Sequence, residues 1–344
     1  MSLLSKSRQP AYHLRPNKAI DRFIFLELLR TLELKNPIGD YKYIGLGGPF
    51  LEDFRLLSHQ FPMMELICVE QDSEIIKRQR FHVCSSKLHC VSSTLGSYIA
   101  TQFPTDRPVI IWADYNDMTR ECLCEIADIV RKAVPGSLLR FTIRAESPVP
   151  WKLKLSPHLY PSRVPSKRDA EFQLIKKNYL SDLAIDGIVF PPEWFQWSDF
   201  SLDKFPRLLA RMIGAIAYGS CTNPKTYLPL HTVKYSDGTI MLSITGLVCL
   251  ADQSDSYKRH FRDHFSLGAV DINEVDEIDV PSLTMKERLC LEEILPTTQS
   301  SGLACLKKLG YLIDGDASEH ESRRKMGQFE KYYRLYPYFG KIIP

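Results

Sequence analysis

Long apolar segments and a regular cysteine framework are both missing from this sequence. Without a run of about 18 uncharged apolar residues, we expect no membrane span. The first residues, MSLLSKSRQPAYHLRPNK, also lack the apolar segment of a signal peptide. The nine cysteines are scattered and odd in number, which favours reduced thiols and a cytoplasmic location.

A large excess of charge of one sign is missing as well. The 344 residues carry a net charge of only +3, and their 44% hydrophobic and 25% charged content is ordinary for a globular protein. The molecule as a whole is therefore no polycation, and any contact with nucleic acid would have to come from a local patch. The chain is long enough for one large domain or two modest ones.

Three familiar ligand-binding signatures are incomplete. Residues 45–48, Gly-Leu-Gly-Gly, begin like the dinucleotide fingerprint G-x-G-x-x-G, but Phe50 occupies the third glycine position. This disfavours a pyrophosphate-binding turn, and the phosphate loop is excluded because no Gly-Lys-Ser/Thr follows. Residues 82–90 contain the order H-x-C-x4-H-C, which matches no standard zinc pattern. We therefore expect no metal.

Helical and strand-like segments alternate between residues 16 and 145. Apolar runs of the kind buried in parallel sheets, separated by helical patterns, predict five strands in this region. The expected strands cover residues 41–46, 64–72, 88–94, 107–115 and 137–145. Such alternation indicates an α/β fold with a doubly wound, mostly parallel sheet. Ser73 is expected to cap the helix after the second strand, and Thr119 to open the helix after the fourth.

The later sequence predicts a helix over residues 205–220 and then two strands around Asp237-Gly238, a strong hairpin signal. This hairpin would add antiparallel strands to the sheet. Thr284 and Glu287 form a capping box for a further helix. We expect four parts: an N-terminal cap segment with a helix (1–40), a Rossmann-like domain (41–280), a lid-like insertion within it (146–206), and a small winged-helix-like C-terminal helical unit (281–344).

The glycine turn and an acid at the end of the next strand form the main candidate site. Gly45, Gly47 and Gly48 let the backbone approach a ligand closely. In a doubly wound sheet such a turn lies at the carboxyl edge, where ligands bind. Glu70 closes the second strand, and a carboxylate can accept hydrogen bonds from two neighbouring ribose hydroxyls. The alternative is that the glycines only make a tight turn between strand and helix.

The segment WADYND, residues 112–117, brings polar side chains to the same edge after the fourth strand. A carboxylate such as Asp114 can act as a general base that removes a proton from a ligand. Asn116 and Asp117 can instead cap the following helix or, with Asp114, contribute to a Mg²⁺ site, whose other ligands are not recognisable. The prolines of the signature found in amino-methylating nucleic-acid enzymes are missing, so methylation of DNA base amino groups is not supported.

Together these features resemble the class I S-adenosylmethionine-dependent methyltransferases, over roughly residues 41–145 and the hairpin. The resemblance implies S-adenosylmethionine as the cofactor and a methyltransferase that acts on an oxygen or nitrogen acceptor. The glycine turn would line the methionine end of the cofactor, Glu70 would take the ribose, and Asp114 would face the sulfonium. The residues implied to bind the cofactor are Gly45, Leu46, Gly47, Gly48, Glu70, Gln71, Thr94 (or Ser93) and Asp114, and the implied catalytic residues are Asp114 and Tyr115.

One position departs from the family pattern. Tyr43 stands where these enzymes usually have an acid, two positions before the first glycine. The departure leaves open a catalytically silent, methyltransferase-like scaffold that binds a partner protein or nucleic acid. A nicotinamide-dependent oxidoreductase is a third hypothesis, which Phe50 disfavours. The first segment also looks like bacterial proteins labelled O-methyltransferase-like, a resemblance that leaves the acceptor unknown.

Basic residues suggest two further contacts. Arg15 and Lys18, in the stretch HLRPNK, can clamp a carboxylate or phosphate; the alternative is a solvated helix start with Asn17 as its N-cap. Residues 152–177 combine lysines and arginines with aromatic residues, a pattern that can bind a partner protein or nucleic acid or simply form a solvated face. We interpret residues 257–265, YKRHFRDHF, as an exposed basic helix.

Overall fold

The computed structural model describes residues 15–61, 65–147, 173–174, 176–178, 182–183, 185, 190–268, 271, 274–296, 302–313 and 318–337. The chain forms two compact units. We call residues 30–234 and 239–276 the sheet unit, and residues 1–29, 235–238 and 277–344 the terminal unit. Each is described by itself.

A mostly parallel sheet is the main feature of the fold. Its strands are β1 (Lys42–Gly45), β2 (Glu65–Glu70), β3 (Leu88–Ser92), β4 (Val109–Asp114), β5 (Leu138–Arg144), β6 (Lys225–Ser236), β7 (Ile240–Leu250) and β8 (Asp276–Ile278). The strand order is β3-β2-β1-β4-β5-β7-β6-β8. Strands β1 to β5 pair in parallel and β7 pairs antiparallel with β5. The predicted fold class, a doubly wound sheet with an antiparallel hairpin, is confirmed.

Helices follow the parallel strands in the predicted alternation. They are α2 (Glu52–Gln60), α3 (Ser73–Phe81), α4 (Leu95–Gln102), α5 (Arg120–Lys132), α8 (Phe205–Ser220) and α9 (Ser254–His264). Helix α1 (Pro16–Glu33) precedes them, and α10 (Met285–Glu292), α11 (Leu303–Leu309) and α12 (Glu319–Tyr332) lie in the terminal unit. Short 3-10 turns cover Ile38–Asp40, Pro192–Trp194, Trp197–Phe200, Ala251–Gln253 and Tyr333–Leu335.

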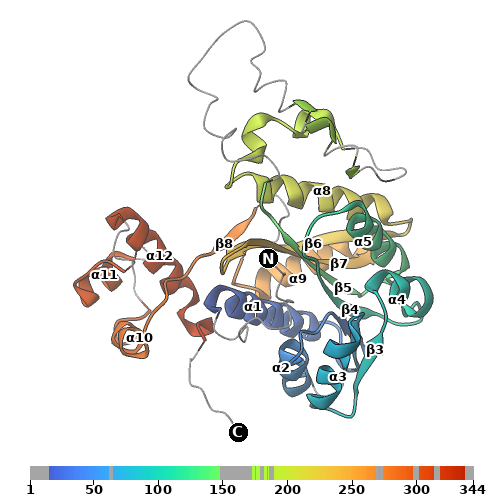
Figure 1. Cartoon of the computed structure of the whole chain (residues 1–344), viewed down its shortest axis with the longest axis horizontal. Coiled ribbons are helices and arrows are strands. Elements are labelled where there is room, and N and C mark those ends of the chain that lie inside the picture. The colour runs from blue at the N-terminus through green and yellow to red at the C-terminus, as the bar shows by residue number, and fades with distance from the viewer. Residues whose placement is uncertain are drawn as a thin grey trace, which may run out of the picture. The chain divides into compact units, whose positions relative to one another are not determined.

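The largest core covers one face of the sheet. Alternate strand residues such as Ile111, Leu139 and Ile244 are fully buried there against the apolar faces of α5 and α8. The two helices lie side by side along the sheet (Figure 1). Burial of this face leaves the other face of the same strands for the polar side chains discussed below.

Helix starts agree with the sequence in two of three positions. Thr119 caps α5, since its hydroxyl accepts a hydrogen bond from the Cys122 amide at 3.2 Å. Thr284 and Glu287 form the expected capping box of α10. The prediction for Ser73 was wrong: Asp72 caps α3 by accepting from two backbone amides, because a carboxylate one residue earlier reaches both.

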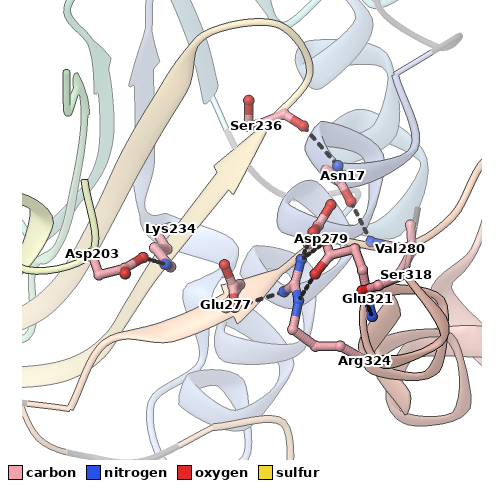
Figure 2. A network of polar contacts seen from close by, with 10 residues as sticks. All are labelled: Asn17, Asp203, Lys234, Ser236, Glu277, Asp279, Val280, Ser318, Glu321 and Arg324. Atoms are coloured by element: carbon pink, nitrogen blue, oxygen red, sulfur yellow. Dashed lines mark hydrogen bonds and ion pairs between the residues drawn. The ribbon is translucent and has the colours of Figure 1, made fainter. Parts of the chain in front are cut away.

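The terminal unit joins segments that are far apart in the sequence. Asn17 is buried; its amide donates to the Ser236 carbonyl at 2.8 Å and its side-chain oxygen accepts from the Val280 amide at 3.0 Å (Figure 2). Asp237, at the hairpin tip, accepts from the Lys18 amide at 2.8 Å. Asn17 is therefore no N-cap; it lies inside α1, and the hairpin supplies the acceptor at the start of the helix.

Arg324 of α12 is the second polar centre of the terminal unit. Its guanidinium pairs with Glu277 at 3.0 Å, with Asp279, and with Glu321 at 2.7 Å (Figure 2). These three carboxylates raise the pKa of Arg324 above its usual range, the hydrogen bond with Glu321 being the largest cause. Two of the acids come from the stretch DEID, residues 276–279, so part of the acidic linker is bound to a helix.

Most of the predicted insertion, residues 146–206, lies outside the described residues, and this includes most of the basic stretch 152–177. Its described end carries four phenylalanines, Phe190, Phe195, Phe200 and Phe205, whose successive ring centroids are 6.5, 6.4 and 5.8 Å apart. All four are buried in the core beside α8. This end of the insertion is therefore anchored to the sheet unit by apolar packing.

Candidate active site

The carboxyl edge of the sheet brings the two predicted carboxylates to one level. Gly45 of β1 pairs with Cys68 on one side and with Trp112 on the other. Glu70 and Asp114 each lie two residues beyond these partners, so they extend past the end of β1 on the same face of the sheet. With neighbouring strands about 4.8 Å apart, their Cα atoms are separated by roughly 10 Å. The glycine turn lies between them.

Strand β1 is also where the direction of the chain through the sheet reverses. The chain moves from β1 to β2 and β3 on one side, and continues with β4 and β5 on the other. In doubly wound sheets the crevice at such a switch point is the usual ligand site. The edge between Glu70 and Asp114 is therefore the candidate active site.

Packing beneath the turn explains Gly47. A Cβ atom at this position would lie 2.8 Å from the Cys68 sulfur and from Leu51 Cδ2, and 2.9 Å from Phe54 Cε2. No side chain fits there unless these atoms move. The tight-turn alternative is thus part of the answer, because Gly47 is required by its own neighbours whether or not a ligand binds.

A residue that the sequence did not indicate holds the turn from outside. Gln79 of α3 is fully buried, and its side-chain amide donates a hydrogen bond to the Gly47 carbonyl. The Gly47 amide hydrogen-bonds the Cys68 sulfur. The amide and the carbonyl of Gly47 are therefore both held by side chains, one from β2 and one from α3. A glutamine inside a helical pattern gives no signal of such a role.

Glu70 is oriented by the backbone that follows it. One carboxylate oxygen accepts hydrogen bonds from the amides of Gln71 and Asp72 at 2.8 and 2.9 Å. Within the described part of the chain, the other oxygen makes no hydrogen bond. A carboxylate fixed at one oxygen and open at the other suits an incoming pair of hydroxyl groups. Gln71 beside it is exposed.

Asp114 ends β4 next to a row of buried polar groups. It pairs in register with Thr142 of β5. The Thr142 hydroxyl accepts from the Trp112 indole at 2.9 Å and shares a hydrogen bond with Ser243 at 2.8 Å. The hydroxyl and indole groups on this face satisfy one another, so the strands that carry Asp114 are held in fixed register.

Arg144 and Asp117 lie further out on the same edge. Arg144, at the end of β5, is 3.4 Å from Asp117 and 3.1 Å from Glu146. All three side chains are exposed, so these ion pairs contribute little to stability. They make this side of the edge polar and leave it accessible.

Comparison with known proteins decides the family. A family model described as "Putative O-methyltransferase" matches residues 10–344. The chain belongs to this family. Since the match covers nearly the whole chain, membership applies to the sheet unit and to the terminal unit alike, and it identifies the chain as a methyltransferase. No curated protein matches the sequence significantly.

Solved structures of similar shape share little sequence with this methyltransferase. The N-methyltransferase NodS of Bradyrhizobium japonicum has 11% identity and a TM-score of 0.36, over 67% of this chain and 97% of its own. A probable spermidine synthase of Corynebacterium glutamicum has 10% identity and a TM-score of 0.37, and the match covers 83% of this chain and 86% of its own. Trm1 of Pyrococcus horikoshii, solved with S-adenosyl-L-methionine, has 10% identity and a TM-score of 0.44, and the match covers 75% of this chain and 60% of its own.

Tyr115 of this methyltransferase does not face the same way as Asp114. It packs beside the core of the α5 face, where burial raises the pKa of its phenol well above the usual range. Its hydroxyl lies next to Glu125 of α5, whose carboxyl pKa is also raised by burial. Glu125 in turn lies against Gly96 at the start of α4. The structure thus separates the two residues that the sequence placed together as catalytic.

The hydroxyl groups after β3 are engaged in local bonds. Thr94 caps α4 by accepting from the Ser97 amide at 3.1 Å, and the Ser93 hydroxyl donates to the Thr94 carbonyl at 2.9 Å. Both lie at the carboxyl edge, one strand beyond Glu70.

Tyr43 explains how the departure from the family pattern is accommodated. The ring is buried and packs edge-on against Phe54, with centroids 5.2 Å apart. Its hydroxyl reaches the underside of the turn, 2.8 Å from where a Gly45 Cβ would be. A phenol thus fills the space below Gly45, and the nearest strand-end carboxylates that the sequence indicated are Glu70 of β2 and Asp114 of β4.

The remaining candidates belong to other elements of the chain. Arg15 and Lys18 belong to the terminal unit. There Asp237 accepts a hydrogen bond from the Lys18 amide. Burial raises the pKa of Asp237, and the charge of Arg15 opposes this in part. In α9, His260 hydrogen-bonds the Thr31 carbonyl at 2.7 Å and His264 is exposed.

Among the described residues, no group of acids, histidines or cysteines is arranged to hold a metal. In the same part of the chain, no helix is long and apolar enough to cross a membrane.

Proposed function

We propose that this methyltransferase binds S-adenosylmethionine at the carboxyl edge of β1, β2 and β4 and transfers its methyl group to a hydroxyl oxygen. One observation carries the proposal: Glu70 and Asp114 extend past β1 on one face, on either side of the glycine turn and at the switch point of the sheet. The family description favours an oxygen acceptor over a nitrogen acceptor.

The residues at this edge fit the proposed cofactor in the chemistry of their donors and acceptors. Residues 45–48 offer backbone with little side-chain bulk, Glu70 offers an open carboxylate oxygen, and Gln71 and Thr94 flank it. Asp114 places negative charge two strands from Glu70, which suits a sulfonium cation. Bound S-adenosylmethionine would supply an electrophilic methyl group.

The protein's part in the reaction would be mainly to position groups. Asp114 is the base proposed to accept the proton of the hydroxyl group as its oxygen is methylated. Holding the acceptor in line contributes most to such a displacement. Arg144, exposed on the same face, is placed to meet a polar acceptor.

Calorimetric titration with S-adenosylhomocysteine tests the cofactor proposal. Glu70→Gln is the sharpest variant, because glutamine keeps an oxygen for the Gln71 and Asp72 amides and loses only the second acceptor. We expect micromolar binding to the wild type and at least a tenfold loss in Glu70→Gln, the cost of about one hydrogen bond to a charged group. Gly47→Arg is a poor test, since it would disturb packing as well as binding.

The matched control is Glu74→Gln. Glu74 lies four residues further on, is exposed, and pairs only with Lys77 on its own helix. This variant should bind as the wild type does. Folded wild-type protein that binds neither S-adenosylhomocysteine nor S-adenosylmethionine would overturn the proposal and favour a scaffold role. If the wild type does bind the cofactor, assays of methyl transfer to small-molecule, protein and nucleic-acid pools would identify the acceptor.

A further inference from the structure

Two cysteines are register partners on neighbouring strands, and one of them, Cys68, packs against the glycine turn. Cys68 of β2 and Cys90 of β3 are register partners in the parallel ladder. Paired residues of parallel strands point to the same face, with their Cα atoms about 4.8 Å apart, which is within the range that a disulfide spans. The pKa of each thiol is shifted chiefly by the other thiol, as expected for two sulfurs that lie side by side.

The two sulfurs differ in exposure and in pKa, and these differences indicate which one reacts first. Cys90 is half-buried on the edge strand β3, so a small solute can reach it, whereas Cys68 is fully buried. The hydrogen bond from Cys68, helped by the charge of Arg80, lowers the pKa of Cys90 to about 7. The same contact and burial raise the pKa of Cys68. At neutral pH Cys90 is therefore partly thiolate, the reactive form, beside a protonated partner.

Cys68 is also part of the support of the turn. Its sulfur accepts from the Gly47 amide and lies where a Gly47 Cβ would meet it. A covalent bond between two sulfurs is shorter than a hydrogen bond between them, so closing a bond to Cys90 draws the Cys68 sulfur towards β3. The Gly47 amide then loses its acceptor, and the packing under the turn changes.

We infer that Cys68 and Cys90 form a reversible disulfide under peroxide, and that this bond weakens cofactor binding by releasing the glycine turn. The formation of the disulfide is argued from the placement of the two cysteines, whereas its effect on cofactor binding rests on the proposed function. Cys84, also half-buried, lies 3.7 Å from the Ser58 hydroxyl and serves as the comparison.

The chemistry balances with a peroxide as the oxidant. The Cys90 thiolate attacks one peroxide oxygen, the O–O bond breaks, and hydroxide leaves, which gives a sulfenic acid at Cys90. The Cys68 sulfur then displaces that hydroxyl, which leaves as water with the Cys68 proton. Two thiols lose two electrons and two protons in total, and hydrogen peroxide becomes two molecules of water. A dithiol reductant reverses the bond by exchange.

The test combines peptide mapping with calorimetry on the full chain. Protein treated with hydrogen peroxide should lose two hydrogen atoms in mass and yield a cross-linked Cys68–Cys90 peptide. Cys90→Ser should yield none, and the matched control Cys84→Ser should yield as much as the wild type. The oxidised wild type should bind S-adenosylhomocysteine roughly tenfold more weakly, a factor equivalent to one lost hydrogen bond, and dithiothreitol should restore binding.

Each result has a separate meaning. Peroxide-treated protein that carries Cys90 sulfinic acid, or a bond to another cysteine, and no Cys68–Cys90 cross-link overturns the disulfide. Cross-linked protein that binds as tightly as the reduced form overturns its effect on the turn. A reduced protein that binds no cofactor overturns the proposed function and with it that effect, whereas the peptide map still decides whether the disulfide forms.

Discussion

At the scale of single residues, strand alternation decides what Asp114 and Tyr115 can do. The Tyr115 amide still donates to the Thr142 carbonyl at 2.7 Å, so the extended backbone of β4 continues through both residues. Successive side chains of such a backbone point to opposite faces. Asp114 therefore lies on the face of Glu70, whereas Tyr115 enters the α5 side. The sequence stretch WADYND contains this alternation, but it does not say where β4 ends.

Replacement of Asp114 by asparagine tests its role as a base. Asparagine has nearly the same shape but cannot accept the acceptor's proton. We expect turnover to fall by about 10²–10⁴, the usual contribution of general base catalysis, while affinity for S-adenosylhomocysteine changes far less. Methyl transfer from labelled S-adenosylmethionine, with the acceptor pool that supports turnover, measures this difference.

Asp117→Asn is the matched control for that experiment. Asp117 lies in the same loop, is exposed, and pairs with Arg144, so its loss should leave turnover within a factor of about two. Equal turnover in Asp114→Asn and the wild type would show that Asp114 is not the base.

At the scale of elements, α3 supports the glycine turn through one side chain. Gln79→Leu would fill the same space but leave the buried Gly47 carbonyl without a donor. We expect a loss of about 1–3 kcal/mol in the free energy of unfolding, the cost of an unsatisfied buried polar group, together with weaker cofactor binding. Urea denaturation and the same titration measure both effects.

Gln102→Leu provides the comparison, because Gln102 is the exposed last residue of α4. A surface change of this kind should alter stability by less than about 0.5 kcal/mol. If Gln79→Leu were equally mild, the bond from α3 to the turn would not contribute to stability, and cofactor binding should then be unchanged as well.

The elements themselves were largely predictable, and the reason is local. Strands β1, β2 and β4 are buried on both faces, so their sequences are continuous apolar runs with polar residues at the ends. Glu70 and Asp114 could be found because they end such runs. Gln79 and Cys90 could not, since their roles depend on which elements pack together. Ser73 failed for a smaller reason: an aspartate one position earlier was the better cap.

At the scale of the whole molecule, the terminal unit was the least predictable part. Asn17 bonds Ser236 and Val280 across separations of 219 and 263 residues. No local pattern encodes a contact at such distances. The signals that were read correctly nearby, the hairpin at Asp237-Gly238 and the capping box at Thr284, are both made by residues close in sequence.

The Arg324 centre of the terminal unit should make stability depend on pH in the acid range. Its hydrogen bond to Glu321 lowers the pKa of that carboxyl in the folded state. The stabilisation is therefore fully present above the ordinary glutamate pKa of about 4.3, and it is lost as the pH falls through the lower folded-state pKa. Asp237, whose pKa burial raises, acts in the opposite direction, but Arg324 substitutions leave its contacts in place.

Arg324→Met should remove this dependence. The variant should have a lower unfolding temperature than the wild type near neutral pH, by a few degrees at most because the pair is partly solvated, and the two should converge as the pH falls below about 4. Scanning calorimetry across the acid range measures the difference. Arg334→Met, in the same unit, removes an exposed arginine that contacts Tyr333, and it should keep the wild-type pH profile. Parallel profiles for Arg324→Met and the wild type would show that Arg324 contributes no pH-dependent stability through Glu321, so that the terminal unit is held by the Asn17 contacts and apolar packing instead.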